Sequence, residues 1–124
     1  MPREREPMKI IAFLLAILLV TMPIAPALAD RVSNLEQVPE LANGAKAFDL
    51  HCAGCHINGG NIVRRGKNLK LKTLQKNHMD SIEAIATIIT NGKGNMSAYR
   101  DRLTSEQIQA VAGYVLDRAQ SDWR

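Results

Sequence analysis

The stretch Cys52-Ala53-Gly54-Cys55-His56 decides the fold of this chain. The pattern C-x-x-C-H is the signature of covalent haem attachment, in which each thiol adds across a haem vinyl group and the imidazole reaches the iron as its proximal ligand. Two alternatives are weaker. A thioredoxin-type C-x-x-C is expected in a βαβ setting, and a structural zinc site needs four ligands and usually a second ligand pair. The sequence around the motif offers neither, so it predicts one haem c per chain.

The haem iron then needs a sixth ligand or an open coordination position. The candidates downstream of the motif are His78, Met79 and Met96. Met96 lies in the glycine-punctuated stretch 91–99 between two helical segments, which can aim a loop residue at a metal. Met79 precedes a helix start and fits better as a core or staple residue, and His78 fits better as a solvated loop residue. We therefore expect His56 and Met96 as the axial ligands.

Apolar periodicity predicts an all-α domain of about four helices, with the haem as part of its core. The expected helices cover about residues 39–50, 68–76, 80–92 and 104–119. The pairs Asp80/Glu83 and Thr104/Gln107 have capping-box spacing at the start of the last two helices. Gly44 lies on the apolar face of the first helix, which indicates a close crossing by another helix.

The last two expected helices each carry an apolar stripe that we assign to core packing. The stripes consist of Ile82, Ile85, Ala86 and Ile89 in one helix, and of Ile108, Val111, Ala112, Val115, Leu116 and Ala119 in the other. No alternating apolar run is long enough to predict a strand.

Length and composition exclude several classes of protein. A chain of 124 residues with two cysteines is one domain and not a disulfide scaffold. A hydrophobic fraction of 46% and a charged fraction of 23% argue against disorder. With 16 Lys and Arg against 12 Asp and Glu, the formal net charge is +4. Nucleic acid is not an expected partner, because the N-terminus predicts export.

The N-terminal residues 1–29 have the pattern of a cleaved secretory signal peptide. Three basic residues precede an apolar run over 10–20, prolines follow, and an A-x-A site ends at Ala29. A membrane anchor is the weaker alternative, because this run is far shorter than the roughly 20 apolar residues that span a bilayer. We expect cleavage after Ala29, which leaves residues 30–124 as a single domain with a flexible tail over 30–38. Either Met1 or Met8 can be the initiating residue.

These features together resemble the cytochrome c6 family, the diffusible class I c-type cytochromes of cyanobacteria and algae. Beyond the haem motif, the similar positions are Gly44, Phe48, Gly59, Gly60, Asn61, Leu69, Leu74, Met79, residues 81–84 and 90–93, Met96, Arg102, Leu103, Tyr114 and Val115. The resemblance implies four helices around one haem and supports His56 and Met96 as axial ligands. It also implies that Gly44 and Phe48 pack against the helix that carries Tyr114.

Three features depart from the usual pattern of that family. Ser97 follows Met96 where the family usually has proline, so the loop lacks a fixed φ at this position. The second helix carries lysines without the glutamates that many members mix in. Ile88 stands where the family often has glutamine near the haem edge. Members with an aliphatic residue there tend toward lower potentials, which implies a tuning role for Ile88. The alternative is that it extends the packing face of Ile82, Ile85 and Ile89.

A run of basic residues follows the motif. It consists of Arg64, Arg65, Lys67, Lys70, Lys72 and Lys76. Such a run is either a solvated face or a docking surface that steers the protein to an acidic partner.

The predicted function is a diffusible, monomeric one-electron carrier and not an enzyme, because no carboxylate pair or nucleophile–base motif indicates a substrate site. The resemblance implies the cytochrome b6f complex as donor and photosystem I or a terminal oxidase as acceptor, in the thylakoid lumen or periplasm of a cyanobacterium. Two alternatives stay open. One is a haem-based sensor or small-ligand binder with a labile Met96, and the other is a tightly bound subunit of a larger redox complex.

Overall fold

The computed structural model describes residues 40–124, and the predicted signal peptide and tail lie outside this range. Residues 40–51 are helical. They are followed by α3 (Ala53–His56), 3₁₀ turns at Ile57–Gly59 and Arg65–Lys67, α4 (Leu71–Lys76), α5 (Ile82–Asn91) and α6 (Ser105–Gln120). This part of the chain contains no strand, only an isolated bridge between Lys93 and Met96, which confirms the all-α prediction. None of its helices is both long enough and apolar enough to cross a membrane.

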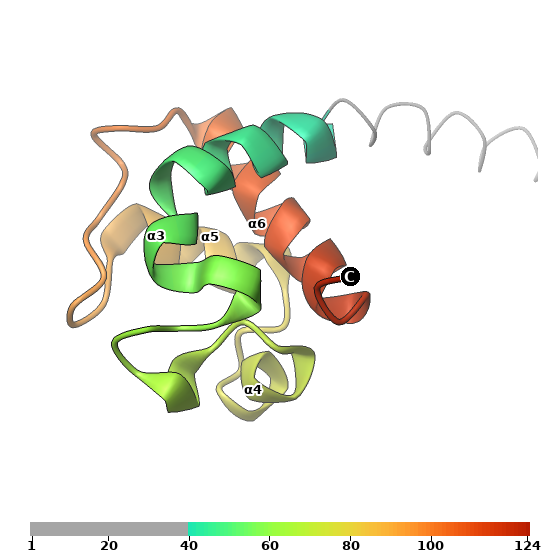
Figure 1. Cartoon of the computed structure of the whole chain (residues 1–124). Coiled ribbons are helices and arrows are strands. Elements are labelled where there is room, and N and C mark those ends of the chain that lie inside the picture. Colours follow the sequence, from blue (N-terminus) through green and yellow to red (C-terminus); the bar gives the residue numbers. More distant parts are fainter. Residues whose placement is uncertain (1–39) are drawn as a thin grey trace, which may run out of the picture. The chain divides into compact units, whose positions relative to one another are not determined.

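The helix over residues 40–51 crosses α6 at Gly44 (Figure 1). A Cβ atom at Gly44 would overlap the backbone carbonyl of Ala110 and lie 2.9 Å from the Cβ atom of Tyr114. The Phe48 ring, one helical turn later, packs on the Tyr114 ring with 5.4 Å between centroids. The crossing that the sequence predicted is therefore confirmed, since a side chain at position 44 would hold the two backbones apart.

The capping box predicted at the start of α6 is present. Thr104 Oγ1 accepts the Gln107 N–H at 3.2 Å, and Gln107 Oε1 accepts the Thr104 N–H at 2.9 Å. Most of the predicted stripe is buried, namely Ile108, Val111, Ala112, Val115 and Ala119. Leu116 is partly buried and packs against this core. The apolar face of α6 thus forms a large part of the hydrophobic core.

Helix α5 differs from its prediction in the first turn. It begins at Ile82 rather than Asp80, and Ser81 is its N-cap, with the Ser81 Oγ atom accepting the Ala84 N–H at 3.2 Å. The predicted pairing of Asp80 was wrong, because a serine directly before the helix already satisfies an otherwise unpaired N–H. The side chain of Ile82 is 37% exposed, so the buried stripe of α5 starts at Ile85.

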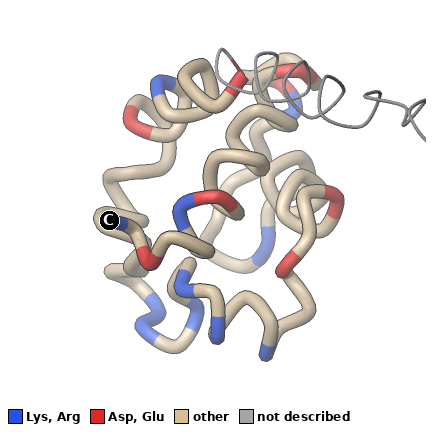
Figure 2. The backbone as a smooth tube through the Cα atoms, turned by 90° about the vertical axis from the view of Figure 1, so that its right-hand side faces the viewer, with Lys and Arg blue, Asp and Glu red and all other residues tan. Residues whose placement is uncertain are grey.

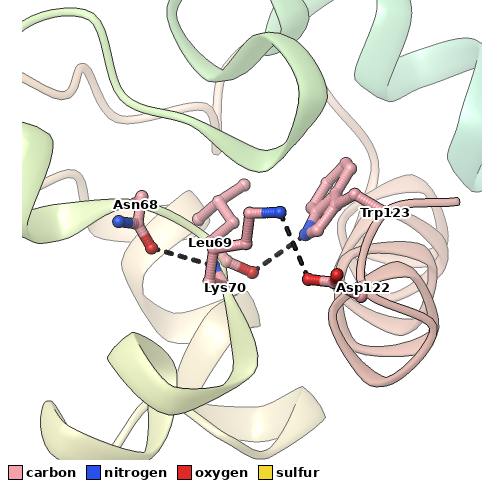
Figure 3. A network of polar contacts seen from close by, with 5 residues as sticks. All are labelled: Asn68, Leu69, Lys70, Asp122 and Trp123. Carbon is pink, nitrogen blue, oxygen red and sulfur yellow. Dashed lines mark hydrogen bonds and ion pairs between the residues drawn. The ribbon is translucent and has the colours of Figure 1, made fainter.

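The helix predicted to begin at Asn68 starts later, because α4 covers only Leu71–Lys76. The residues just before α4 have an extended backbone, and their N–H and carbonyl groups form hydrogen bonds outside any helix (Figure 3). Asn68 Oδ1 accepts the Lys70 N–H at 3.0 Å, and the Leu69 carbonyl accepts the indole N–H of Trp123 at 3.0 Å. A local side-chain turn and a tertiary hydrogen bond thus replace the first predicted helical turn.

The C-terminal turn fastens this segment to the rest of the fold. Asp122 and Trp123 have left-handed backbones, with φ of 55° and 58°, and non-glycine residues hold such conformations where surrounding contacts fix them. Asp122 Oδ1 lies 3.2 Å from Lys70 Nζ, as Figure 3 shows. The Trp123 ring packs on Phe48 with 5.4 Å between centroids and fills the space where a Cβ atom at Gly59 would lie.

Gly44→Ala should lower the free energy of unfolding by about 1–3 kcal/mol, because the added methyl group overlaps the backbone of α6. Gly113→Ala is the matched control: a Cβ atom there meets no described atom within 4 Å. In the interior of α6 it should raise the free energy of unfolding by about 0.5–1 kcal/mol. Denaturant unfolding of both holoproteins measures the difference. A Gly44→Ala variant as stable as the wild type would contradict the close crossing.

Candidate haem site

A cavity of about 350 Å³ lies between the C-x-x-C-H motif, α4, α5, α6 and the loop after α5. Cys52, Cys55, His56 and Met96 all line it, so the structure brings the four predicted haem-binding residues around one space. The rest of the lining is mainly apolar and includes Phe48, Leu69, Leu74, Ile85, Ile88, Ile89, Val111 and Val115. A concave apolar space with a few convergent donor groups has the character of a cofactor site.

The motif follows directly on the helix over residues 40–51. The Cys52 N–H still donates to the Phe48 carbonyl at 2.8 Å, and the His56 N–H donates to the Cys52 carbonyl at 2.9 Å. Side chains three and four positions apart lie on the same side of a helical turn. This local geometry explains why Cys52, Cys55 and His56 face one cavity.

The two cysteines are free thiols, as attachment to haem vinyl groups requires. Burial, together with the neighbouring Cys55, raises the pKa of the Cys52 thiol to about 11. Before haem attachment, the Cys52 thiol is therefore neutral at physiological pH, unlike the low-pKa thiolate on which thioredoxin-type exchange depends. Within residues 40–124, no three His, Cys, Asp or Glu side chains are grouped so as to hold a metal ion.

The His56 ring is oriented by a hydrogen bond to the turn that follows it. Its Nδ1 atom lies 2.9 Å from the Gly60 carbonyl oxygen. Because a carbonyl only accepts, Nδ1 carries the proton and Nε2 is the free nitrogen. Gly60 is itself held by the hydrogen bond from its N–H to the Ile57 carbonyl, at 2.9 Å. Histidines that bind a metal through one nitrogen usually donate their other N–H in this way, so His56 fits an iron ligand.

Met96 lies in the loop between α5 and α6, as predicted. Gly92 ends α5 with a left-handed φ of 70°, and a side chain there would collide with the loop backbone at Met96 and Ala98. Lys93 and Met96 exchange two backbone hydrogen bonds of 3.0 and 3.1 Å, which close a tight turn. The turn places Met96, partly buried, on the cavity.

Met79 also lines the cavity, although the sequence assigned it to the core. It packs against the core as predicted, and its N–H donates to the Leu74 carbonyl at 2.9 Å. Two thioether side chains, from Met79 and Met96, therefore line the same space. His78 is exposed and is not part of the lining, in agreement with its assignment to a solvated loop. The sequence pattern around Met79 indicates core packing and could not show that its side chain also lies beside the cofactor site.

Five of the six basic residues are exposed, and Figure 2 shows Lys and Arg gathered toward one end of the fold. Arg64 and Lys67 line the cavity, and Arg65 lines a shallow hollow beside it. Lys72 and Lys76 lie on α4 outside the cavity. The residues next to the cavity and those on α4 are thus two parts of one basic surface.

Lys70 differs from the other five basic residues. It is partly buried, and its ammonium group pairs with the carboxylate of Asp122 at 3.2 Å. This pair offsets the charge that Lys70 would add to the basic surface, a contact between residues 52 positions apart that the local charge run does not reveal.

Three apolar side chains that follow the motif are exposed to solvent. Ile57, Ile62 and Val63 have exposed fractions of 60%, 66% and 56%, and Val63 also lines the cavity. No pattern in the sequence indicated these three residues, because isolated apolar residues among polar ones form no periodicity. They give the protein an uncovered apolar surface directly before Arg64 and Arg65.

Ile88 lines the cavity from α5. It is partly exposed, whereas its neighbours Ile85 and Ile89 are 5% and 3% exposed and belong to the core. Its position is therefore compatible with either predicted role, since Ile88 borders the packing face and also the cavity.

The chain is similar to several known proteins. A family model described as "Cytochrome C oxidase, cbb3-type, subunit III" matches residues 39–115, which contain the motif, α5 and the Met96 loop. A cytochrome c6-like protein of Nostoc sp. (strain PCC 7120) is 65% identical over 82 residues, which are 66% of this chain and 74% of that protein. Cytochrome c6 of Parathermosynechococcus lividus is 50% identical over 84 residues, 68% of this chain and 97% of that protein.

A solved structure shows the same similarity. The crystal structure of cytochrome c6C from Synechococcus sp. PCC 7002 matches with a TM-score of 0.64 and 64% identity, covering 65% of this chain and 99% of that one. The similarity therefore extends over nearly the whole of that domain, in sequence and in fold.

Proposed function

This chain belongs to the cytochrome c6 family of class I c-type cytochromes and carries haem c covalently, and we propose that it is a diffusible one-electron carrier with His56 and Met96 as axial ligands. The observation that carries this proposal is the cavity lined by two free thiols, an imidazole with a free Nε2 atom and a methionine. In the proposal, Cys52 and Cys55 form the thioethers. Bound haem supplies reversible exchange of one electron between ferrous and ferric iron.

The side chains around the cavity account for transfer of electrons rather than binding of substrates. With His56 and Met96 both bound to it, the haem iron would have no position left for a substrate. Thioether ligation favours the ferrous state, and the apolar lining excludes water, which further disfavours the charged ferric form. Val63, which lines the cavity, and its neighbour Ile62 are exposed, and they would form part of the surface at which bound haem exchanges electrons with a partner.

The proposed partners are membrane redox complexes: cytochrome b6f as donor, and photosystem I or a terminal oxidase as acceptor. The proposed location is the cyanobacterial thylakoid lumen or periplasm, which agrees with the signal peptide predicted over residues 1–29. The basic surface supports an acidic docking site on the partner, because charges outside the contact mainly accelerate association. We propose a monomer, since a carrier must expose the haem edge to each partner in turn.

A second candidate function is a haem-based sensor in which Met96 is labile. Two observations favour it: Ser97 leaves the φ angle of the loop unfixed, and Met79 offers another thioether at the same cavity. A tightly bound subunit of a larger redox complex is a third, in keeping with the description of the matched family model. Size exclusion of the native membrane extract separates this third candidate from a diffusible carrier.

Met96→Ala should open the sixth coordination position while the haem stays attached. The oxidised protein should lose the weak far-red band of methionine-bound ferric haem, its midpoint potential should fall, and the reduced form should bind carbon monoxide. Met79→Ala is the matched control, because it removes the same side chain from the same cavity and should change none of these properties. Absorption spectra, redox titration and carbon monoxide titration measure all three.

Other results of this experiment would overturn particular parts of the proposal. If Met79→Ala rather than Met96→Ala opened the sixth coordination position, the assignment of Met96 as the ligand would be wrong. A wild-type protein that binds carbon monoxide readily would favour the sensor. Haem that is extracted from the wild type by acid–acetone would contradict attachment through Cys52 and Cys55.

Lys72→Glu combined with Lys76→Glu should slow association with photosystem I by roughly tenfold at low ionic strength, because both charges add to long-range steering. The dissociation rate constant should change little. Lys46→Glu reverses an exposed charge on another helix and should have a much smaller effect. Flash-induced transfer kinetics over a range of ionic strength give these rates. A wild-type rate that does not depend on salt would support a merely solvated face.

Ile88→Gln should raise the midpoint potential, which we propose lies below that of a typical cytochrome c6. An amide at this position brings an oriented dipole beside the haem, and the family pattern indicates the direction of its effect. Ile82→Gln is the matched control on the same helix, because Ile82 does not line the cavity. Redox titration of the three proteins decides the matter. An unchanged or lower potential in Ile88→Gln would leave Ile88 with a packing role alone.

A further inference from the structure

Tyr99 connects the two segments that carry the proposed axial ligands. It follows Met96 in the loop before α6, and its hydroxyl group donates a hydrogen bond of 2.9 Å to the carbonyl of His51. His51 directly precedes Cys52 and the rest of the motif. Among residues 40–124, this is the only hydrogen bond between the stretch 92–103 and the stretch 40–60. The phenol of Tyr99 therefore makes a direct link that nothing else in the described chain duplicates.

The surroundings of Tyr99 hold its side chain in place for this bond. Its N–H donates to the Ile89 carbonyl at 2.9 Å, and its own carbonyl accepts the N–H groups of Arg102 and Leu103, both at 2.9 Å. The ring meets the His51 ring at its edge, with 6.1 Å between centroids, and the Arg102 guanidinium lies 5.4 Å from the ring centre. Tyr99 also lines the cavity. A side chain fixed in this way loses little further freedom when its hydroxyl group bonds to His51.

The Met96 loop depends on anchors at its two ends. On one side, the paired backbone hydrogen bonds of Lys93 and Met96 close the turn. On the other side, neither Ser97 nor Ala98 makes a hydrogen bond with any described residue, and Ser97 leaves its φ angle free where a proline would fix it. Tyr99 is thus the first fixed point after Met96.

We propose that Tyr99 is a positioning residue that holds the Met96 loop against the haem-binding motif and so keeps the sixth coordination position closed. The inference rests on the proposed ligation by Met96. An external ligand can replace Met96 only when the loop moves away from the cavity, and that movement is opposed by the bond from Tyr99 to His51. Removing this bond should increase the population of the open loop by roughly 2- to 12-fold, the range that corresponds to the net contribution of one hydrogen bond.

The test is the affinity of the oxidised protein for imidazole, measured by titration of its absorption spectrum; where Met96 is bound, the change includes loss of the far-red band. Tyr99→Phe keeps the ring and removes the hydroxyl group, and its affinity for imidazole should exceed that of the wild type by roughly 2- to 12-fold. Tyr114→Phe is the matched control. Tyr114 packs on Phe48 and Trp123, and its hydroxyl group has no hydrogen-bond partner among residues 40–124, so the affinity should stay that of the wild type.

Met96→Ala separates failure of this inference from failure of the proposed ligation. If Met96 is the ligand, Met96→Ala lacks the far-red band, and adding Tyr99→Phe to it should leave its affinity for imidazole unchanged. A Met96→Ala protein that keeps the band would overturn the ligation itself. If Met96→Ala loses the band while Tyr99→Phe behaves as the wild type, the positioning role is overturned and the ligation stands. An added effect of Tyr99→Phe in the double variant would likewise contradict action through Met96.

Discussion

The close approach of Gly44 to the backbone of α6 is the constraint on which the rest of the structure depends. It lets Phe48, one turn later, reach the aromatic ring of Tyr114, and it fixes the direction in which the helix continues. That direction determines where Cys52 begins the C-x-x-C-H turn. The place of the cofactor is therefore set by two helices that touch at a residue without a side chain, eight positions before the first thiol.

The cavity and the hydrophobic core are largely the same set of residues. Leu74, Ile85, Ile89, Val111 and Val115 are all buried, and each also lines the cavity. A domain of this size with few aromatic side chains has little apolar surface of its own to bury. A bound porphyrin would add a large apolar body where these side chains converge. The same side chains therefore stabilise the fold and bind the cofactor.

Features that depend on spacing within a few turns of helix could be predicted from the sequence. The capping box at Thr104 and the close helix crossing at Gly44 are of this kind. The late start of α4 could not, because the indole of Trp123 takes the Leu69 carbonyl from 54 positions away. Nor could a pattern of apolar residues show that Met79 shares the cavity with Met96, since both methionines satisfy the same rule for burial. Both the start of α4 and the place of Met79 depend on contacts between residues far apart in the sequence.

The C-terminal turn links the stability of the fold to the charge that a partner meets. Asp122 holds Lys70 at the segment that Trp123 fastens, so the charge of Lys70 serves a tertiary contact rather than the open basic surface. The charges of Arg64 and Lys67 lie beside the cavity, next to an apolar surface that includes Ile62. For the proposed carrier this division is useful, because distant charges speed encounter while a small apolar contact allows rapid release. A carrier that moves between two partners needs one surface that allows both fast association and fast release.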